Sequence, residues 1–395
     1  MPIGVSHGGA NVYASDARSD EILVGTRNGV VLLERAGSRW EVTHRALEGL
    51  HISAIAPVPE SDTVFAGAFF KSVHASTDGG RTWQRRDEGI TYPDIFSLAV
   101  KQLADGKTRV CAGTEPANLF QSDDLGEHWA LVPSMRAVRS VEDWWFPGPP
   151  HFAHTKFIRF SPTEPEVMYA CIEQGALLRS EDLGESWIEA NTLGTFGDTA
   201  GRSEVFYDIH KLLIDPRDPR KLFVTGGAGL YVTDDRGAHW QRRMAPGWAE
   251  DVYPDGLVHN PRQPDVMFMS AAAHNPAHWR EGGIPGFSGS SMYRSTDGGA
   301  SWELLTNGLP VHSQEEVGGL ALEDWGEGYQ VFAATSAGDV WWTEDGGESW
   351  SRVASGLGAV AKKGHAILLS SEVYPAVGPR PGQPGRDAPA ATASG

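Results

Sequence analysis

The strongest constraint on the fold is a short motif that recurs along the chain. It runs Ser or Thr, any residue, Asp, any residue, Gly, two variable positions and Trp. Six copies are nearly complete: STDGGRTW (76–83), SDDLGEHW (122–129), SEDLGESW (180–187), TDDRGAHW (233–240), STDGGASW (295–302) and TEDGGESW (343–350). A weaker copy, LERAGSRW (33–40), keeps only the Gly and the Trp, and the seven tryptophans are 43 to 62 residues apart. Seven units with this period predict a β-propeller rather than a β-sandwich.

Each residue type in the motif has a physical role. The Asp carboxylate can accept backbone N–H groups of a tight turn, and Gly can adopt the positive φ that such a turn requires. The Trp supplies a large apolar face that can pack between neighbouring sheets. The motif resembles the Asp-box, or BNR, repeat of sialidases, sortilin-type receptors, photosystem assembly factors and some xyloglucan-degrading glycosidases. The resemblance covers about residues 20–372 and implies the fold, but the repeat occurs on catalytic and non-catalytic propellers alike.

The segments between the motifs divide into strands. Two apolar runs precede each motif, the Trp opens a further strand, and one more strand lies upstream. The upstream strands are HISAIAPV (51–58), DIFSLAV (94–100), HTKFIRFSP (154–162), DIHKLLIDP (208–216), YPDGLVHNP (253–261) and EVGGLALE (316–323). The first repeat lacks this strand, and GHAILLS (364–370) is predicted to supply it and close the ring. The sequence therefore predicts an all-β, seven-bladed propeller of four-stranded antiparallel blades over residues 1–374.

Composition excludes several classes of partner. The formal net charge of −18 argues against nucleic acid and anionic membranes, which both need a basic surface. No apolar run is long enough to cross a membrane and no basic-then-apolar leader is visible, so a cytoplasmic, monomeric protein is expected. Cys111 and Cys171 lie in apolar segments and predict buried thiols rather than a disulfide. Residues 375–395 are rich in Pro, Gly and Ala and predict a disordered tail.

The upstream strands predict a ring of polar side chains. The innermost strand of a propeller blade lines the central axis, so its first residue faces one mouth of the channel. Alignment of the strands gives seven such positions: His51, Asp94, His154, Asp208, Tyr253, Glu316 and His365. Lys156, His210 and Asp255 lie two residues further in, and the next layer is aliphatic. One mouth of the axis is therefore expected to be titratable.

Three long insertions are predicted on the same face of the propeller. They cover residues 131–153, 190–207 and 273–290. Insertions confined to one face of a regular scaffold indicate a binding or catalytic site. We interpret six of their residues as contacts for a small organic or carbohydrate ligand: Trp144, Trp145, His151, His274, His278 and Trp279.

The histidines of the ring predict a metal-dependent enzyme as the leading interpretation. Neutral imidazoles of His51, His154, His210 and His365 would bind a divalent transition metal, with Zn, Cu, Fe and Ni all compatible. Three such ligands leave a position for water or substrate. The residues assigned to catalysis in this interpretation are Asp208, Glu316, Tyr253 and Asp94.

Two other interpretations remain open. A glycoside hydrolase needs two carboxyl groups about 5–10 Å apart, which Asp94, Asp208 and Glu316 could supply. The resemblance to sialidases would imply an arginine triad, and the predicted ring contains no arginine, so sialidase activity itself is not expected. A non-catalytic scaffold would instead bind a protein or peptide through exposed aromatic residues at 144–146.

Overall fold

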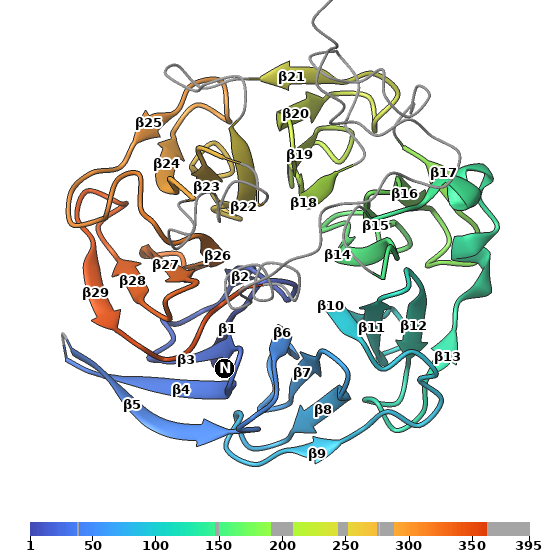
Figure 1. Cartoon of the computed structure of the whole chain (residues 1–395), viewed down its shortest axis with the longest axis horizontal. Helices are drawn as coiled ribbons and strands as arrows, with labels where there is room; N and C mark the ends of the chain where they lie inside the picture. Colours follow the sequence, from blue (N-terminus) through green and yellow to red (C-terminus); the bar gives the residue numbers. More distant parts are fainter. Residues whose placement is uncertain are drawn as a thin grey trace, which may run out of the picture.

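The protein forms a ring of seven β-sheets around a central axis (Figure 1). The structure, a computed structural model, describes residues 1–37, 39–146, 150–190, 208–243, 252–274, 276 and 288–361. Each sheet has its first strand near the axis and its last strand at the rim. The predicted seven-bladed, all-β propeller is confirmed.

The blades are numbered along the chain, with their strands given from the axis outward. Blade 1 is β1 (Ile3–Val5), β3 (Glu21–Thr26), β4 (Gly29–Ala36) and β5 (Arg39–Ala46); blade 2 is β6 (Ile52–Pro57), β7 (Val64–Ala68), β8 (Ser72–Ser76) and β9 (Gln84–Arg85). Blade 3 is β10 (Ile95–Gln102), β11 (Thr108–Thr114), β12 (Leu119–Ser122) and β13 (Ala130–Leu131); blade 4 is β14 (His154–Phe160), β15 (Met168–Glu173), β16 (Leu177–Ser180) and β17 (Ile188–Glu189). Blade 5 is β18 (Ile209–Ile214), β19 (Leu222–Gly226), β20 (Gly229–Thr233) and β21 (Gln241–Arg243); blade 6 is β22 (Tyr253–His259), β23 (Met267–Ala272), β24 (Ser291–Ser295) and β25 (Glu303–Leu304). Blade 7 is β26 (Val317–Asp324), β27 (Tyr329–Thr335), β28 (Val340–Thr343) and β29 (Ser351–Ala354), with β2 (Val12–Ala14) added beside β26.

The repeated motif forms the turn between the third and fourth strands of a blade. In blade 4, Ser180 Oγ donates to Asp182 Oδ1 at 2.7 Å and accepts from Gly184 N at 2.7 Å. Asp182 Oδ1 also accepts from Ser186 N at 2.8 Å, and Gly184 has φ of 99°. The carboxylate and the hydroxyl thus satisfy the turn's backbone N–H groups, as the sequence pattern predicts.

The motif tryptophans join neighbouring blades. Trp129 of blade 3 is buried in a cluster with Phe65 of blade 2, and its Nε1 donates to Arg86 O at 3.1 Å. Trp40 of blade 1 packs edge-on against Phe332 of blade 7, with ring centroids 5.4 Å apart. The Trp of the weaker first copy of the motif therefore has a packing role, because its ring fills the junction between the first and last blades.

The innermost position of blade 1 is filled by the N-terminal segment. β1 lies parallel to β3 and pairs Ile3 with Ile22, and both Ile3 and Val5 are fully buried. This is the position predicted for residues 364–370, which lie outside the described residues, and β1 occupies it instead. The alternating apolar residues of β1 fit the buried inner edge of β3, and β2 then pairs in parallel with β26 of blade 7. The same N-terminal segment therefore bridges the first and last blades.

Between β1 and β2 the chain runs through the axis of the propeller (Figure 1). Gly8 N donates to Ser53 O of blade 2 at 2.8 Å, and Gly8 O accepts from Leu98 N of blade 3 at 3.2 Å. Asn11 contacts two further blades, since its O accepts from Leu322 N at 2.9 Å and its Nδ2 donates to Leu257 O at 3.0 Å. The axis below the polar mouth is therefore filled by this axial segment, residues 6–11, rather than left as a channel.

The described residues also include two cysteines and two short 3-10 helices. Cys111 and Cys171 are buried free thiols, as predicted. In the described part of the chain the helices are two short 3-10 turns, η1 (Pro133–Arg136) and η2 (Arg139–Asp143), and neither could cross a membrane. The predicted tail, 375–395, lies outside the described residues.

Substitution of Gly8 tests the axial segment. A Cβ at this position would overlap the carbonyl oxygen of Phe96, a backbone atom that cannot move aside independently. Gly8→Ala is therefore expected to lower the free energy of unfolding by about 3 kcal/mol or more, measured by urea titration. Gly37→Ala is the control, because Gly37 has positive φ but no neighbour within 4 Å, and it should cost only about 1 kcal/mol. Equal effects of the two substitutions would contradict the packing described.

The turn aspartates predict a loss of stability in acid. Hydrogen bonds from Thr233 and Ser301 hold the pKa of Asp235 and of Asp297 at about 2. An unfolded aspartate titrates at about 3.9, so this stabilisation is complete above about pH 4 and is lost as the pH falls towards 2. The urea midpoint should decrease over that interval. Asp297→Asn should make the decrease shallower, and an unchanged pH profile in that variant would count against the assignment.

Candidate polar centre at the axis

The inner strands carry a β-bulge near their first residues, and this bulge directs polar side chains towards the axis. Register shifts occur between Thr155 and Phe157 in β14, between Ile209 and Lys211 in β18, and between Pro254 and Leu257 in β22. The residues inside these shifts include Lys156, His210 and Asp255. A bulge turns an extra residue out of the regular pairing, which is a common way to aim a side chain at a site. These are the three polar residues that the sequence placed two positions inward.

Glu173 is the centre of this group. It ends β15 directly opposite His154, the first residue of β14, and it is fully buried. His154 Nε2 makes a short hydrogen bond with Glu173 Oε2, and Lys156 Nζ lies 3.3 Å from Glu173 Oε1. His210 Nε2 lies 3.9 Å from the same Oε1. One carboxylate therefore links the inner strands of blades 4 and 5.

Lys156 connects Glu173 to Asp255 of blade 6. Its Nζ lies 3.4 Å from Asp255 Oδ1, and the lysine is fully buried. Burial lowers the pKa of Lys156, but attraction to Asp255 and Glu173 outweighs it, so the pKa is raised above that of an ordinary lysine. The lysine is therefore a permanent cation at the axis.

Asp255 is the matching permanent anion. Burial raises its pKa, but Lys156, His7 and His210 outweigh burial and hold the pKa well below the usual range. His7 comes from the axial segment, with Nδ1 at 3.9 Å from Asp255 Oδ2 and 3.0 Å from Gly318 O. The N-terminal segment thus contributes a side chain to the centre as well as filling the axis.

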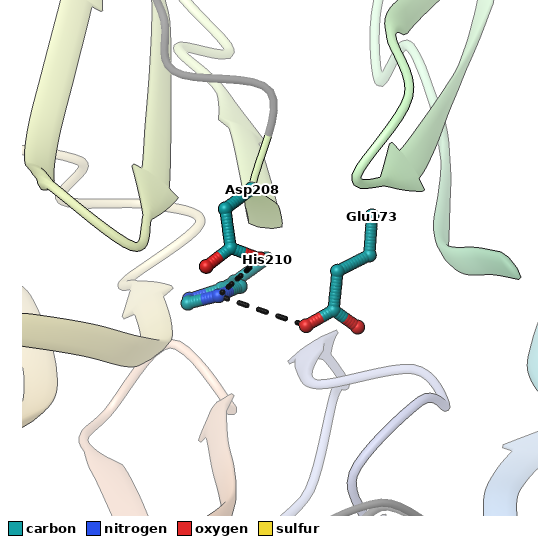
Figure 2. Close-up of side chains that lie close together, drawn as sticks. All are labelled: Glu173, Asp208 and His210. Carbon is teal, nitrogen blue, oxygen red and sulfur yellow. Dashed lines mark ion pairs between the residues drawn. The ribbon is translucent and has the colours of Figure 1, made fainter. Parts of the chain in front are cut away.

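His210 has its two ring nitrogens in different surroundings. Nδ1 lies 2.7 Å from the carbonyl oxygen of Pro254, to which it can donate. Nε2 faces Asp208 Oδ1 at 3.5 Å and Glu173 Oε1 at 3.9 Å, and it has no hydrogen-bond partner among the described residues. Figure 2 shows the two carboxylates on either side of this ring edge. Ligand atoms of Glu173, Asp208 and His210 all lie within 4.8 Å of one another.

Tyr253 and Glu316 lie beside the same centre. The centroid of the Tyr253 ring lies 4.4 Å from that of the His210 ring. Tyr253 and Glu316 line a narrow hollow, together with Asp255, Ser270, Ala272, Ser290 and Val317. Burial and the carboxylates of Asp208 and Glu173 raise the pKa of Tyr253 well above its ordinary value. The tyrosine therefore stays a neutral phenol and a hydrogen-bond donor.

The other predicted ring residues lie apart from this centre or outside the described residues. His51 packs on Phe69 with centroids 4.6 Å apart, and its Nε2 lies 2.9 Å from Ala361 O. Asp94 is buried beside β10, and its carbonyl oxygen accepts from Glu115 N at 2.9 Å. His365, His278 and Trp279 fall outside the described residues, while His274 is exposed. The structure thus brings His154 and His210 to one carboxylate, while His51 lies apart from them.

Aromatic rings from β10 and from the first insertion cover His154. Phe96 stacks on His154 at 3.9 Å, and Phe146 lies against the same ring at 5.1 Å. Trp145 stacks on His151 at 5.1 Å. Trp144 donates to Ser140 Oγ at 3.0 Å. All three aromatic residues of 144–146 are half-buried, so they do not form the exposed anchors that the scaffold interpretation assumed.

Sequence reasoning missed three members of the centre: His7, Glu115 and Glu173. Glu115 lies 3.4 Å from His154 Nδ1 and, like Glu173, follows the apolar run of a second strand. The second strand of a blade ends opposite the start of the first strand, so an acidic residue closing that run was the available signal. His7 lay in a segment without any copy of the motif, and only the pair Gly8–Gly9 marked it for close packing.

These features define a class: the chain is a seven-bladed β-propeller whose blade turns carry a repeated Asp- and Trp-containing motif. No known family model matches the chain. It is 27% identical over 289 residues to a xyloglucanase of Paenibacillus sp, covering 66% of this chain and 25% of that protein. It is 26% identical over 259 residues to xyloglucanase Xgh74A of Acetivibrio thermocellus, covering 58% and 29%. The chain therefore spans about a quarter of the length of these curated relatives.

Solved structures share the fold at low identity. The GH74 xyloglucanase of Xanthomonas campestris superposes with a TM-score of 0.62 at 19% identity, covering 90% of this chain and 56% of that chain. YCF48 from Cyanidioschyzon merolae superposes with a TM-score of 0.56 at 15% identity, covering 87% and 96%. A YCF48 structure with bound D1 peptide gives a TM-score of 0.54 at 15% identity, covering 85% and 93%.

Removal of the central cation tests the ionic network. Lys156→Met leaves Glu173 and Asp255 without the ammonium between them, so it is expected to lower the free energy of unfolding by about 3–5 kcal/mol. Lys107, whose side chain is 61% exposed, provides the control, and Lys107→Met should change stability by less than about 0.5 kcal/mol. Urea unfolding at pH 7 measures both. A loss below about 1 kcal/mol in Lys156→Met would show that the buried pairs contribute little.

Proposed function

We propose that the chain is a carbohydrate-acting glycoside hydrolase. The observation that carries the proposal is the 27% identity over 289 residues to a xyloglucanase, which covers 66% of this chain. Asp255 and Glu316 line one narrow hollow beside the axis and are the carboxylates that we assign to the reaction. Xyloglucan-type β-glucans are accordingly the first substrate class to test.

The charged neighbours of Asp255 suit one of the two carboxyl roles that a glycoside hydrolase needs. Asp255 is held ionised by Lys156, His7 and His210, and an ionised carboxylate can stabilise or attack the positive anomeric carbon. Glu316 is then the proton donor to the departing glycosidic oxygen. Acid and carboxylate roles in glycosidases depend on a difference in environment. Tyr253, which remains a phenol, would donate a hydrogen bond to a sugar hydroxyl.

A protein- or peptide-binding scaffold is the second candidate. It is favoured by the coverage of the structural neighbours, because the chain matches 96% of one YCF48 chain but only a quarter of the length of the curated xyloglucanases. Against it, the aromatic residues at 144–146 are half-buried and packed within their own loop. The two candidates differ in a simple property, since a scaffold should show no turnover of any glycan.

Hydrolysis of xyloglucan oligosaccharides, mixed β-glucans and aryl β-glycosides tests the proposal. We expect turnover by the wild-type chain, with Asp255→Asn and Glu316→Gln each lowering kcat by about 10²–10⁴-fold. Glu327→Gln, which changes an exposed carboxylate, is the matched control and should keep wild-type kcat. Circular dichroism establishes that each variant is folded. Absence of turnover in the wild-type chain, or full activity in both site variants, would refute the proposal.

A further inference from the structure

Three buried side chains from two blades converge on one point next to the axis. Glu173 ends β15 of blade 4, while Asp208 precedes β18 of blade 5 and His210 lies within it. Glu173 and His210 are fully buried and Asp208 is 7% exposed. Their ligand-type atoms all lie within 4.8 Å of one another (Figure 2). Two carboxylates and one imidazole are thus held close together with little access to bulk water.

The hydrogen bond made by the His210 ring determines which ring nitrogen directs an unprotonated lone pair at the two carboxylates. Nδ1 lies 2.7 Å from Pro254 O, and a carbonyl oxygen can only accept, so Nδ1 carries the proton. In the neutral ring Nε2 then presents a lone pair to Asp208 and Glu173, whose oxygens also carry lone pairs. A cation between them turns this repulsion into attraction. Metal-binding histidines are commonly fixed in this way, with the second nitrogen donating to a backbone carbonyl.

The separations fit one small cation. Zinc lies about 2.0–2.2 Å from histidine nitrogen and carboxylate oxygen, so two ligands at the tetrahedral angle are about 3.4 Å apart. His210 Nε2 is 3.5 Å from Asp208 Oδ1 and 3.9 Å from Glu173 Oε1. Both distances from Nε2 are therefore close to the value for one metal ion, and the two carboxylates, within 4.8 Å of each other, would close on the ion by side-chain rotation.

The surrounding charge also favours a divalent cation. The buried carboxylates around this point are Glu115, Glu173, Asp208, Asp255 and Glu316, and the buried ammonium groups are Lys156 and Lys211. Burial lowers the pKa of His154, but Glu173 and Glu115 outweigh it and raise that pKa, so the His154 ring adds to the positive side. The five carboxylates still outnumber the positive groups. Lys156 lies between Glu173 and Asp255, so its charge is shared with a carboxylate on the other side. Burying a charge without a compensating charge is costly, and a divalent ion would supply compensating positive charge.

We propose that Glu173, Asp208 and His210 bind one divalent transition-metal ion, with Zn²⁺ as the test ion. Three protein ligands leave a fourth position for water or another oxygen donor. Of the four histidines expected from the sequence to bind a metal, this ligand set includes His210, and His365 lies outside the described residues. It is independent of the proposed hydrolase function, because metal binding is measured without any substrate.

Gly227 offers a probe that leaves all three ligands in place. Its N–H donates to Asp208 O at 2.8 Å, and a Cβ added at this glycine would overlap the Asp208 carboxylate. Gly227 does not have a positive φ, so alanine fits its backbone conformation. Gly227→Ala should therefore displace the Asp208 carboxylate and weaken metal binding without removing a ligand.

The experiment uses the untagged full chain, stripped with a chelator and titrated with Zn²⁺ by calorimetry. We expect about one ion per chain, with at least about 10-fold weaker binding in Glu173→Gln, Asp208→Asn, His210→Ala and Gly227→Ala. His128→Ala and Asp218→Asn change exposed residues of the same types and should bind like the wild type. Absence of Zn²⁺ binding, or unchanged binding in the ligand variants, would overturn the proposal.

Substitution with Co²⁺ provides a readout that needs no variant. A tetrahedral nitrogen- and oxygen-ligated Co²⁺ in the wild-type chain should give visible d–d absorption that Zn²⁺ abolishes by competition. If His210 carries a second proton in place of a metal, neither the absorption nor the calorimetric binding appears, and the proposal fails. Glycan turnover has no bearing on either readout, so failure of the hydrolase proposal is distinguishable from failure of the metal site.

Discussion

The structure depends on the fit of a short backbone segment in the middle of the ring. Residues 6–11 hydrogen-bond to inner strands of six blades, and Gly8 and Gly9 approach those strands too closely for any side chain. Seven wedge-shaped sheets converging on an axis leave a gap that apolar side chains alone do not fill here. The segment fills it with backbone and satisfies its own polar groups on the surrounding strands. Because the axis is plugged, the polar residues gather at its mouth.

The polar centre is a set of opposite charges shared among several blades. Lys156 of blade 4 contacts Asp255 of blade 6, and Glu173 contacts groups from blades 4 and 5. Each ion lost its hydration on burial, and only good geometry with several partners offsets that cost. Replacement of these residues with aliphatic side chains would have been the simpler way to fill this space. Retention of so many charges next to a hollow is the pattern expected where charge serves recognition or chemistry.

The sequence predicted the regular part of the molecule well. The repeated motif defined the blades, and period-two alternation located the first residues of the six inner strands to within one position. The centre was predicted only in part, because contacts between blades do not follow from alignment within a blade. Glu173 and Glu115 end second strands, a position that the alignment did not examine. The N-terminal strands were missed because β1 and β2 contain no motif and pair in parallel with strands far away in the chain.

The pairing of β2 with β26 has a consequence for how the ring assembles. Val12 pairs with Leu322, 310 residues further along the chain, so β2 can pair only after β26 of the last blade has been synthesised. Contacts between such distant parts of a chain are slow to form because loop closure must precede them. Until then the nascent chain exposes unpaired strand edges, which are prone to aggregation. Chaperone dependence during synthesis and slow refolding from denaturant are the expected consequences of this long-range parallel pairing.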